Sequence, residues 1–316
     1  MGYRAKLSIL SAFAVLLIGI FLFMGLGSNW DYALPRRTVK ILAIIITSIA
    51  IGFSTLVFQT ITNNRILTPN ILGLDSLYLL IQTFLVFLFG STHVTMLNKN
   101  VNFAISLCFM MLFALIFYQL LFKRAGKDIY LLLLIGLILG TFFGSLTSFM
   151  QVLIDPNEFL IVQDRMFASI NNVNTDLLYL SIVGIFLVGL YTLKYAKYLD
   201  VLALGREHAV NLGVDFDLVV KRLLIIVAVL VSISTALTGP MTFLGLLVIN
   251  VAREFFKTYK HSILTAGTIL FALIALVGGQ LLIEKVFTFS TTLSVVINFI
   301  GGIYFIYLLL KENRSW

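Results

Sequence analysis

The chain has 316 residues, of which 60% are hydrophobic and only 11% are charged. A single soluble core cannot bury that much apolar surface, so the composition excludes an ordinary water-soluble protein and indicates that lipid surrounds the chain. The formal net charge is +8, but the basic residues stand singly or in pairs between apolar runs. This scatter excludes a continuous basic face, and we therefore expect no nucleic-acid partner.

Apolar runs of about 20 residues, long enough to cross a hydrocarbon core of about 30 Å, recur along the whole chain. Runs bounded by charges, prolines or polar clusters predict ten membrane helices. They cover residues 7–27, 37–62, 72–90, 101–122, 129–152, 176–195, 219–238, 242–256, 262–285 and 291–310. We therefore expect residues 1–316 to form a single all-α, polytopic transmembrane domain.

Two of these helices need comment. Arg4 and Lys6 precede the first apolar run as in a signal peptide, but the run is longer than usual and lacks an evident cleavage pattern. We expect a retained first span. The eighth helix, 242–256, is short for a full crossing and follows Gly239-Pro240, which predicts a half-membrane or broken helix.

The distribution of lysine and arginine predicts the orientation. If the N-terminus is cytoplasmic, sixteen of the 22 basic residues face inward, as the positive-inside rule requires. The six that face outward are Arg36, Arg37, Lys40, Lys99, Arg165 and Lys285. We expect a multi-pass protein of the cytoplasmic membrane with both termini in the cytoplasm.

Two connections are long. The outer one, about 151–175, contains turn-forming residues, and Met166, Phe167 and Ile170 predict a short surface helix within it. The inner one, 195–221, predicts two short helical pieces, each followed by a glycine. Its second piece presents polar side chains beside apolar ones, which suits either docking in a groove of another protein or lying among lipid headgroups.

Two of the spans show the pattern of an internal repeat. Thr68-Pro69 is followed by Leu72-Gly73-Leu74, and Gly239-Pro240 by Leu244-Gly245-Leu246, with spacings that differ by one residue. The two spans run in opposite directions by the charge count, which is the arrangement of an inverted repeat in a transporter.

The sequence contains no recognisable catalytic set. His93, His208 and His261 fall in connections or at span ends, away from any carboxylate pair. A phosphate-binding Gly-x-x-x-x-Gly-Lys-Ser/Thr loop is missing, so we expect no ATP site in this chain. Cys108 is the only cysteine and is predicted to be a small buried hydrophobe. We expect neither an enzyme, nor a metal site, nor a resident cofactor.

Polar side chains within the spans are mostly amides, either bonding between helices or lining a translocation path. The path candidates are Gln59, Asn250, Gln280 and Asn298. Outside, Arg36 and Arg37 follow Leu34-Pro35 at the start of the second span, where they could meet carboxylates on a partner or anchor the helix at the interface.

Four stretches carry a resemblance to a known family. Leu204-Gly205-Arg206-Glu207-His208-Ala209-Val210-Asn211-Leu212-Gly213 resembles the coupling-helix motif of FecCD-type permeases, which import iron chelates and cobalamin. The run from Gly239 to Val248, followed by Ala252-Arg253, resembles the family signature after the seventh span. Leu34-Pro35-Arg36 resembles an external family motif. Ile249 and Asn250 replace the usual Pro-His, and this substitution, like residues 59–73, resembles the subgroup for catecholate siderophores such as petrobactin or enterobactin.

The resemblance implies a type II ABC importer permease that translocates an iron(III)–siderophore. It implies a second permease subunit, identical or related, and two cytosolic ATP-binding subunits that bind ATP and Mg²⁺. These would dock on a coupling helix at about 200–213, through Leu204, Gly205, Arg206, Glu207, His208, Ala209, Asn211 and Gly213. It also implies an external siderophore-binding protein, whose glutamates would meet Arg36 or Arg37, with Lys285.

Two alternatives have different requirements. An ion-coupled secondary transporter of a small solute would need an intramembrane Asp, Glu or His, and only Asp75, expected near the inner end of the third span, comes close. An intramembrane enzyme would need a carboxylate pair, histidine cluster or activated nucleophile at one depth. The sequence fixes neither the siderophore nor whether the two permeases are identical.

Overall fold

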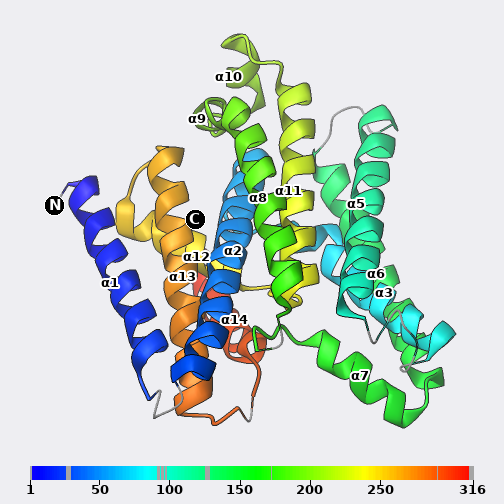
Figure 1. The fold of residues 1–316 in the computed structure, drawn as a ribbon. Coiled ribbons are helices and arrows are strands. Elements are labelled where there is room, and N and C mark those ends of the chain that lie inside the picture. Colours follow the sequence, from blue (N-terminus) through cyan, green and yellow to red (C-terminus); the bar gives the residue numbers. More distant parts are fainter. Residues whose placement is uncertain are drawn as a thin grey trace.

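The computed structural model describes residues 2–25, 30–90, 93, 96, 98–124, 129–171, 173–289 and 291–312. Within these ranges the regular elements are helices, which Figure 1 shows as a bundle with most axes roughly aligned. The longer ones are α1 (Tyr3–Phe23), α2 (Trp30–Thr62), α5 (Lys99–Arg124), α6 (Ile129–Leu153), α8 (Thr175–Ala196), α11 (Phe216–Thr238), α13 (His261–Lys285) and α14 (Leu293–Glu312). The shorter ones are η1 (Pro69–Leu72), α3 (Leu74–Phe89), α7 (Pro156–Met166), α9 (Leu199–Leu202), α10 (Arg206–Asn211) and α12 (Leu244–Phe256).

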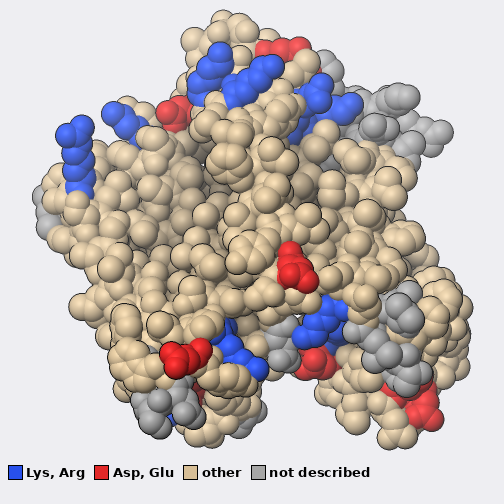
Figure 2. All heavy atoms as spheres, in the orientation of Figure 1, with Lys and Arg blue, Asp and Glu red and all other residues tan. Residues whose placement is uncertain are grey.

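The outer surface of the bundle is apolar. Large hydrophobic side chains such as Val152, Leu193 and Phe299 are 84%, 70% and 69% exposed. Figure 2 shows a broad, almost uncharged band between the two ends of the molecule. Helices α1, α2, α5, α6, α8 and α13 are each long and apolar enough to cross a membrane. The chain is therefore an all-α, polytopic membrane protein, as predicted.

Helices α2 and α11 form the centre of the bundle and pack against each other, with α5, α8 and α13 around them. Small hydroxyl residues such as Ser48, Ser54, Ser232 and Ser234 are buried on these two helices. Such residues let two helix backbones approach closely where lipid offers no hydrophobic driving force. Small buried side chains on α2 and α11 therefore suit the close packing of these helices.

Each of the ten predicted spans contains a helix, although some boundaries differ. Helix α2 begins at Trp30, seven residues before the predicted start, and includes Pro35. Pro35 is the sixth residue of α2 and has no backbone N–H to donate to the carbonyl of Asp31, yet the helix continues through it. Helix α12 has 13 residues, so it rises only about 20 Å and is the short helix that the sequence predicts.

Two local predictions are wrong. The short helix of the outer connection is α7, which begins earlier because Asp155 accepts a hydrogen bond from the Asn157 backbone at 2.8 Å and Pro156 occupies the first helical position. Ile170 is buried in the bundle instead of lying on the surface. Cys108 is exposed on α5, where lipid can accept an apolar thiol as readily as a protein core.

The start of α3 also lies elsewhere than predicted. Asp75 accepts hydrogen bonds from Thr235, in the last turn of α11, at 3.3 Å, and from Thr242 at 3.4 Å. It therefore lies in the first turn of α3 and near the end of α11 that is far from α10, so α3 begins inside the bundle. The six residues 63–68 can reach this depth because an extended chain covers about 20 Å over that length.

The two proline-containing breaks of the proposed repeat meet inside the bundle. Thr68, Pro69 and Asn70 line a small cavity together with Met241 and Thr242. A short helix, α3 or α12, follows each break. This juxtaposition is the arrangement that an inverted repeat would produce at its symmetry centre.

Candidate functional site

The α9–α10 segment (residues 199–213) projects from one end of the bundle, at the top of Figure 1. Two glycines define its shape. Gly205 precedes α10 with φ +91°, a conformation open to glycine but not to proline. Gly213 has φ +80° and ends α10, with its N–H donating to Val210 and the next N–H donating to Ala209. This pair of bonds is a Schellman motif.

The segment presents apolar side chains to its surroundings although it lies beyond the long helices. Leu204, Val210 and Leu212 are 55%, 52% and 63% exposed, while Ala209 is fully buried against the bundle. Arg206 forms an exposed ion pair with Asp217 of α11, with 3.3 Å between Nη2 and Oδ1. Glu207, His208 and Asn211 are exposed. A small rigid element with exposed leucines and mixed charges has the composition of a docking surface.

Asp200 fastens this segment to the rest of the bundle. Its Oδ1 accepts from the His261 backbone at 2.8 Å and lies 2.6 Å from the His261 ring Nδ1. Partial burial works against ionisation, but these bonds and the nearby charges of His261 and Lys260 lower the pKa of the Asp200 carboxyl below its usual value. An ionised Asp200 therefore links α9 to the first turn of α13 at neutral pH.

Sequence reasoning did not find this pair. It placed His261 at a span end without a carboxylate partner, because the 61 residues that separate it from Asp200 conceal the contact. The one available signal was Asp200 at the start of a short helix, where an acidic side chain is common for capping reasons alone.

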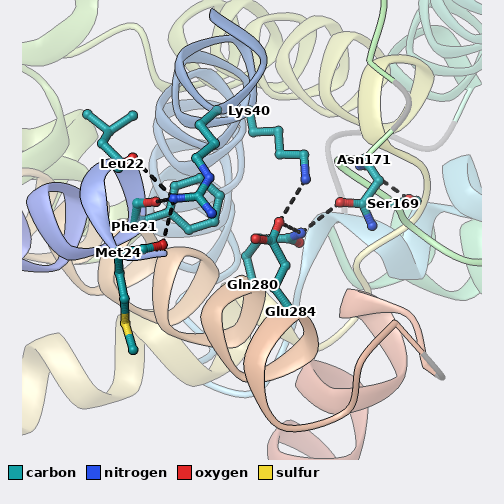
Figure 3. Close-up of polar contacts among 9 residues, drawn as sticks. Phe21, Leu22, Met24, Lys40, Ser169, Asn171, Gln280 and Glu284 are labelled. Carbon is teal, nitrogen blue, oxygen red and sulfur yellow. Dashed lines mark hydrogen bonds and ion pairs between the residues drawn. The ribbon is translucent and has the colours of Figure 1, made fainter. Parts of the chain in front are cut away.

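The predicted external docking residues lie at the opposite end of the bundle. They differ in the contacts that their side chains make within the chain. Arg37 donates to the carbonyls of Phe21, Leu22 and Met24, which end α1, at 2.9, 3.1 and 2.9 Å (Figure 3). Its guanidinium caps a helix C-terminus, where a positive charge is favourable.

The other two basic residues are more accessible. Arg36 is exposed and its guanidinium lies 4.1 Å from the centre of the Tyr32 ring. Lys285 is exposed at the end of α13. Of the three predicted residues, these two present a charge that a partner could meet, whereas the charge of Arg37 is directed into the chain.

A polar network lies beside them. Lys40 forms an ion pair with Glu284 at 2.7 Å, and Gln280 donates to both Glu284 and Asn171, at 3.0 and 2.8 Å (Figure 3). The network joins α2, α13 and the connection between α7 and α8. Gln280, a predicted path residue, is fully buried within it.

The remaining amides contact backbone groups. Gln59 and Asn250 both donate to the carbonyl of Arg65, at 2.6 and 3.2 Å. Asn298 accepts from the backbone N–H of Phe243, which precedes α12, at 3.4 Å. Each of these three amides therefore holds a break between helices in place. The predicted role of Gln59, Asn250, Asn298 and the buried Gln280 along a translocation path stays a prediction.

The fold and these surfaces define a multi-pass membrane protein with a short helical segment, α9–α10, that projects from one end. The chain belongs to the FecCD transport family, whose pattern matches residues 27–311. It is 64% identical over its full length to all of the petrobactin import system permease protein YclO of Bacillus subtilis. It is also 36% identical to the petrobactin import system permease protein FatC of Bacillus anthracis, over 88% of this chain and 78% of that protein.

A solved structure shares the fold. An inward-facing metal-chelate type ABC transporter matches 98% of this chain and 100% of its own, with a TM-score of 0.80 and 22% identity. The similarity extends over the full bundle, which supports the ten-span, all-α interpretation.

Proposed function

We propose that this chain is a permease subunit of an ABC importer that moves an iron(III)–petrobactin type chelate across the cytoplasmic membrane. The observation that carries the proposal is the 64% identity, from end to end, with a petrobactin import permease. Iron enters as part of the chelate and is cargo. The chain supplies no ATP site or cofactor of its own, and ATP and Mg²⁺ bind to the partner subunits.

The α9–α10 segment is the proposed docking site for the ATP-binding subunits and faces the cytoplasm, as do both termini. Its exposed Leu204 and Leu212 enter a groove on the partner, and Glu207 and His208 pair with polar groups around it. A second permease, identical or related, completes the complex with two ATP-binding subunits. ATP binding and hydrolysis shift the paired segments, which switches the path between outward-open and inward-open states.

The transport proposal is tested in cells that lack their own siderophore permeases. We expect this chain, with the second permease, the ATP-binding subunits and the binding protein of its system, to restore uptake of radiolabelled iron–petrobactin. Uptake should stop when the ATPase is inactivated and persist when the ion gradient is collapsed with ATP held constant. The reverse pattern would favour the alternative, an ion-coupled transporter that uses Asp75.

At the opposite end, Arg36 and Lys285 are the proposed contacts for glutamates of the binding protein. We expect Arg36→Glu combined with Lys285→Glu to weaken binding of the chelate-loaded protein about tenfold or more, because both pairs become repulsive. Surface plasmon resonance on the complex in nanodiscs measures this effect. Lys99→Glu, which changes another of the basic residues predicted to face outward, is the control, and equal weakening by both would contradict the assigned docking site.

A further inference from the structure

A basic cavity of about 490 Å³ opens at the α10 end of the bundle. It lies between the last turn of α2, the end of α12 and the first turn of α13. Three cationic side chains line it, together with hydroxyl and amide groups that can donate hydrogen bonds. The cations are Arg65, Arg253 and Lys257, and the polar groups belong to Gln59, Thr60, Asn63, Asn64, Thr258, Tyr259 and His261.

The cavity carries positive charge that its described lining does not balance. Its described lining contains no aspartate or glutamate. Within the described part of the chain, neither Arg65 nor Arg253 forms an ion pair. The two guanidinium groups are close enough to repel each other, and Arg253 is half-buried. Holding these charges together is unfavourable unless an anion joins them.

The position of Arg65 is fixed from two helices. The amides of Gln59 on α2 and Asn250 on α12 both donate to its backbone carbonyl, at 2.6 and 3.2 Å. His261 is already engaged, with Asp200 on one ring nitrogen and the Thr60 hydroxyl 2.8 Å from the other. Arg65, Arg253 and Lys257 are therefore the charged side chains in the lining that are left to bind an anion.

The cavity lies at the depth of a membrane surface. Helix α2 ends at Thr62 and α12 at Phe256, and Tyr259 between α12 and α13 is 76% exposed. Lys6, near the start of α1, donates to the carbonyl of Phe255 at 2.6 Å and so places another cation beside the end of α12. Exposed tyrosines mark the interfacial layer, and basic pockets between membrane helices on the cytoplasmic side bind anionic headgroups.

We propose that this cavity binds the phosphate group of an anionic phospholipid such as phosphatidylglycerol, with Arg65 and Arg253 as its main donors. Arginine suits this role because its planar guanidinium can donate two parallel hydrogen bonds to phosphate oxygens. Ala203 of the α9–α10 segment also lines the cavity, so a bound headgroup would touch the docking element directly. A soluble phosphate would use the same donors.

Native mass spectrometry and thermal shift on the full chain in detergent test the site, with phosphatidylglycerol and phosphatidylcholine as probes. We expect wild type to bind and be stabilised by phosphatidylglycerol in preference to phosphatidylcholine. Arg65→Gln combined with Arg253→Gln should weaken that binding roughly thirtyfold, since two interfacial cations are lost. Arg222→Gln, which removes an arginine at the same end but outside the cavity, should leave it unchanged.

The different probes distinguish a phospholipid headgroup from free phosphate as the ligand. Stabilisation by inorganic phosphate alone, lost in the double glutamine variant, would assign the same phosphate site to a soluble ligand. Arg65→Lys combined with Arg253→Lys keeps the charge and should retain most binding, which guards against a variant that fails to fold. Equal binding of both lipids by wild type, or binding of phosphatidylglycerol and phosphate unaffected by the glutamine pair, would overturn the proposal.

Discussion

Gly205→Pro is expected to abolish ATP-driven chelate uptake while leaving the protein in the membrane at normal abundance. Gly205 has φ +91°, which a proline fixed near φ −65° cannot adopt, and its N–H donates to the Leu202 carbonyl at 3.0 Å. The change therefore breaks the turn that sets α10 against α9 and displaces Leu204 and Leu212. The long helices keep their contacts with one another, so insertion should be unaffected. Uptake of radiolabelled chelate and ATPase activity of the purified complex measure the effect.

The uncoupling interpretation needs two comparisons. Gly189→Ala, on α8 in open space and in ordinary helical conformation, should transport like wild type. Glu207→Lys changes a charge without altering the backbone, and it should also uncouple chelate uptake from ATP hydrolysis. Normal uptake by either Gly205→Pro or Glu207→Lys would remove the α9–α10 segment from the coupling role.

Much of the fold follows from hydropathy alone, because each membrane helix must satisfy its own backbone and so appears as a long apolar run. The short α12 was predictable from its length and its Gly239-Pro240 break. The depth of α3 was not. Residues 63–68 run back into the bundle without regular secondary structure. No local sequence pattern distinguishes such a re-entrant segment from a turn at the surface. The contacts of Asp75 with Thr235 and Thr242 reveal it.

The candidate surfaces were predictable to different degrees. The α9–α10 segment follows from its paired glycines, since each marks a helix end whatever the tertiary contacts. The involvement of Arg37 with α1 depends on the packing of two helices, as does the convergence of Gln59 and Asn250 on Arg65. Such partners are distant in sequence, and residue type alone permits a binding role, a path role or a capping role for each.

A second large effect is expected at Gly73, where Gly73→Ala should destabilise the folded chain by about 3 kcal/mol or more. Two costs combine there. The residue has φ +80°, and an added Cβ would lie 2.9 Å from the Cα of Gly140 on α6. That contact involves backbone on both sides, so no side chain can move to relieve it. Helices α3 and α6, which pack along each other, would have to separate.

Thermal unfolding of the isolated chain in detergent measures this effect, with Gly144→Ala as the matched control. Gly144 lies one turn further along α6 with open space around its Cα, so the same substitution should leave the melting temperature nearly unchanged or raise it slightly, since alanine favours helix. If Gly73→Ala had the same melting temperature as the Gly144→Ala control, the η1–α3 break would not pack against α6. Because that break meets the one at Gly239-Pro240 beside Asp75, the proposed symmetry centre of the bundle would then lose its structural basis.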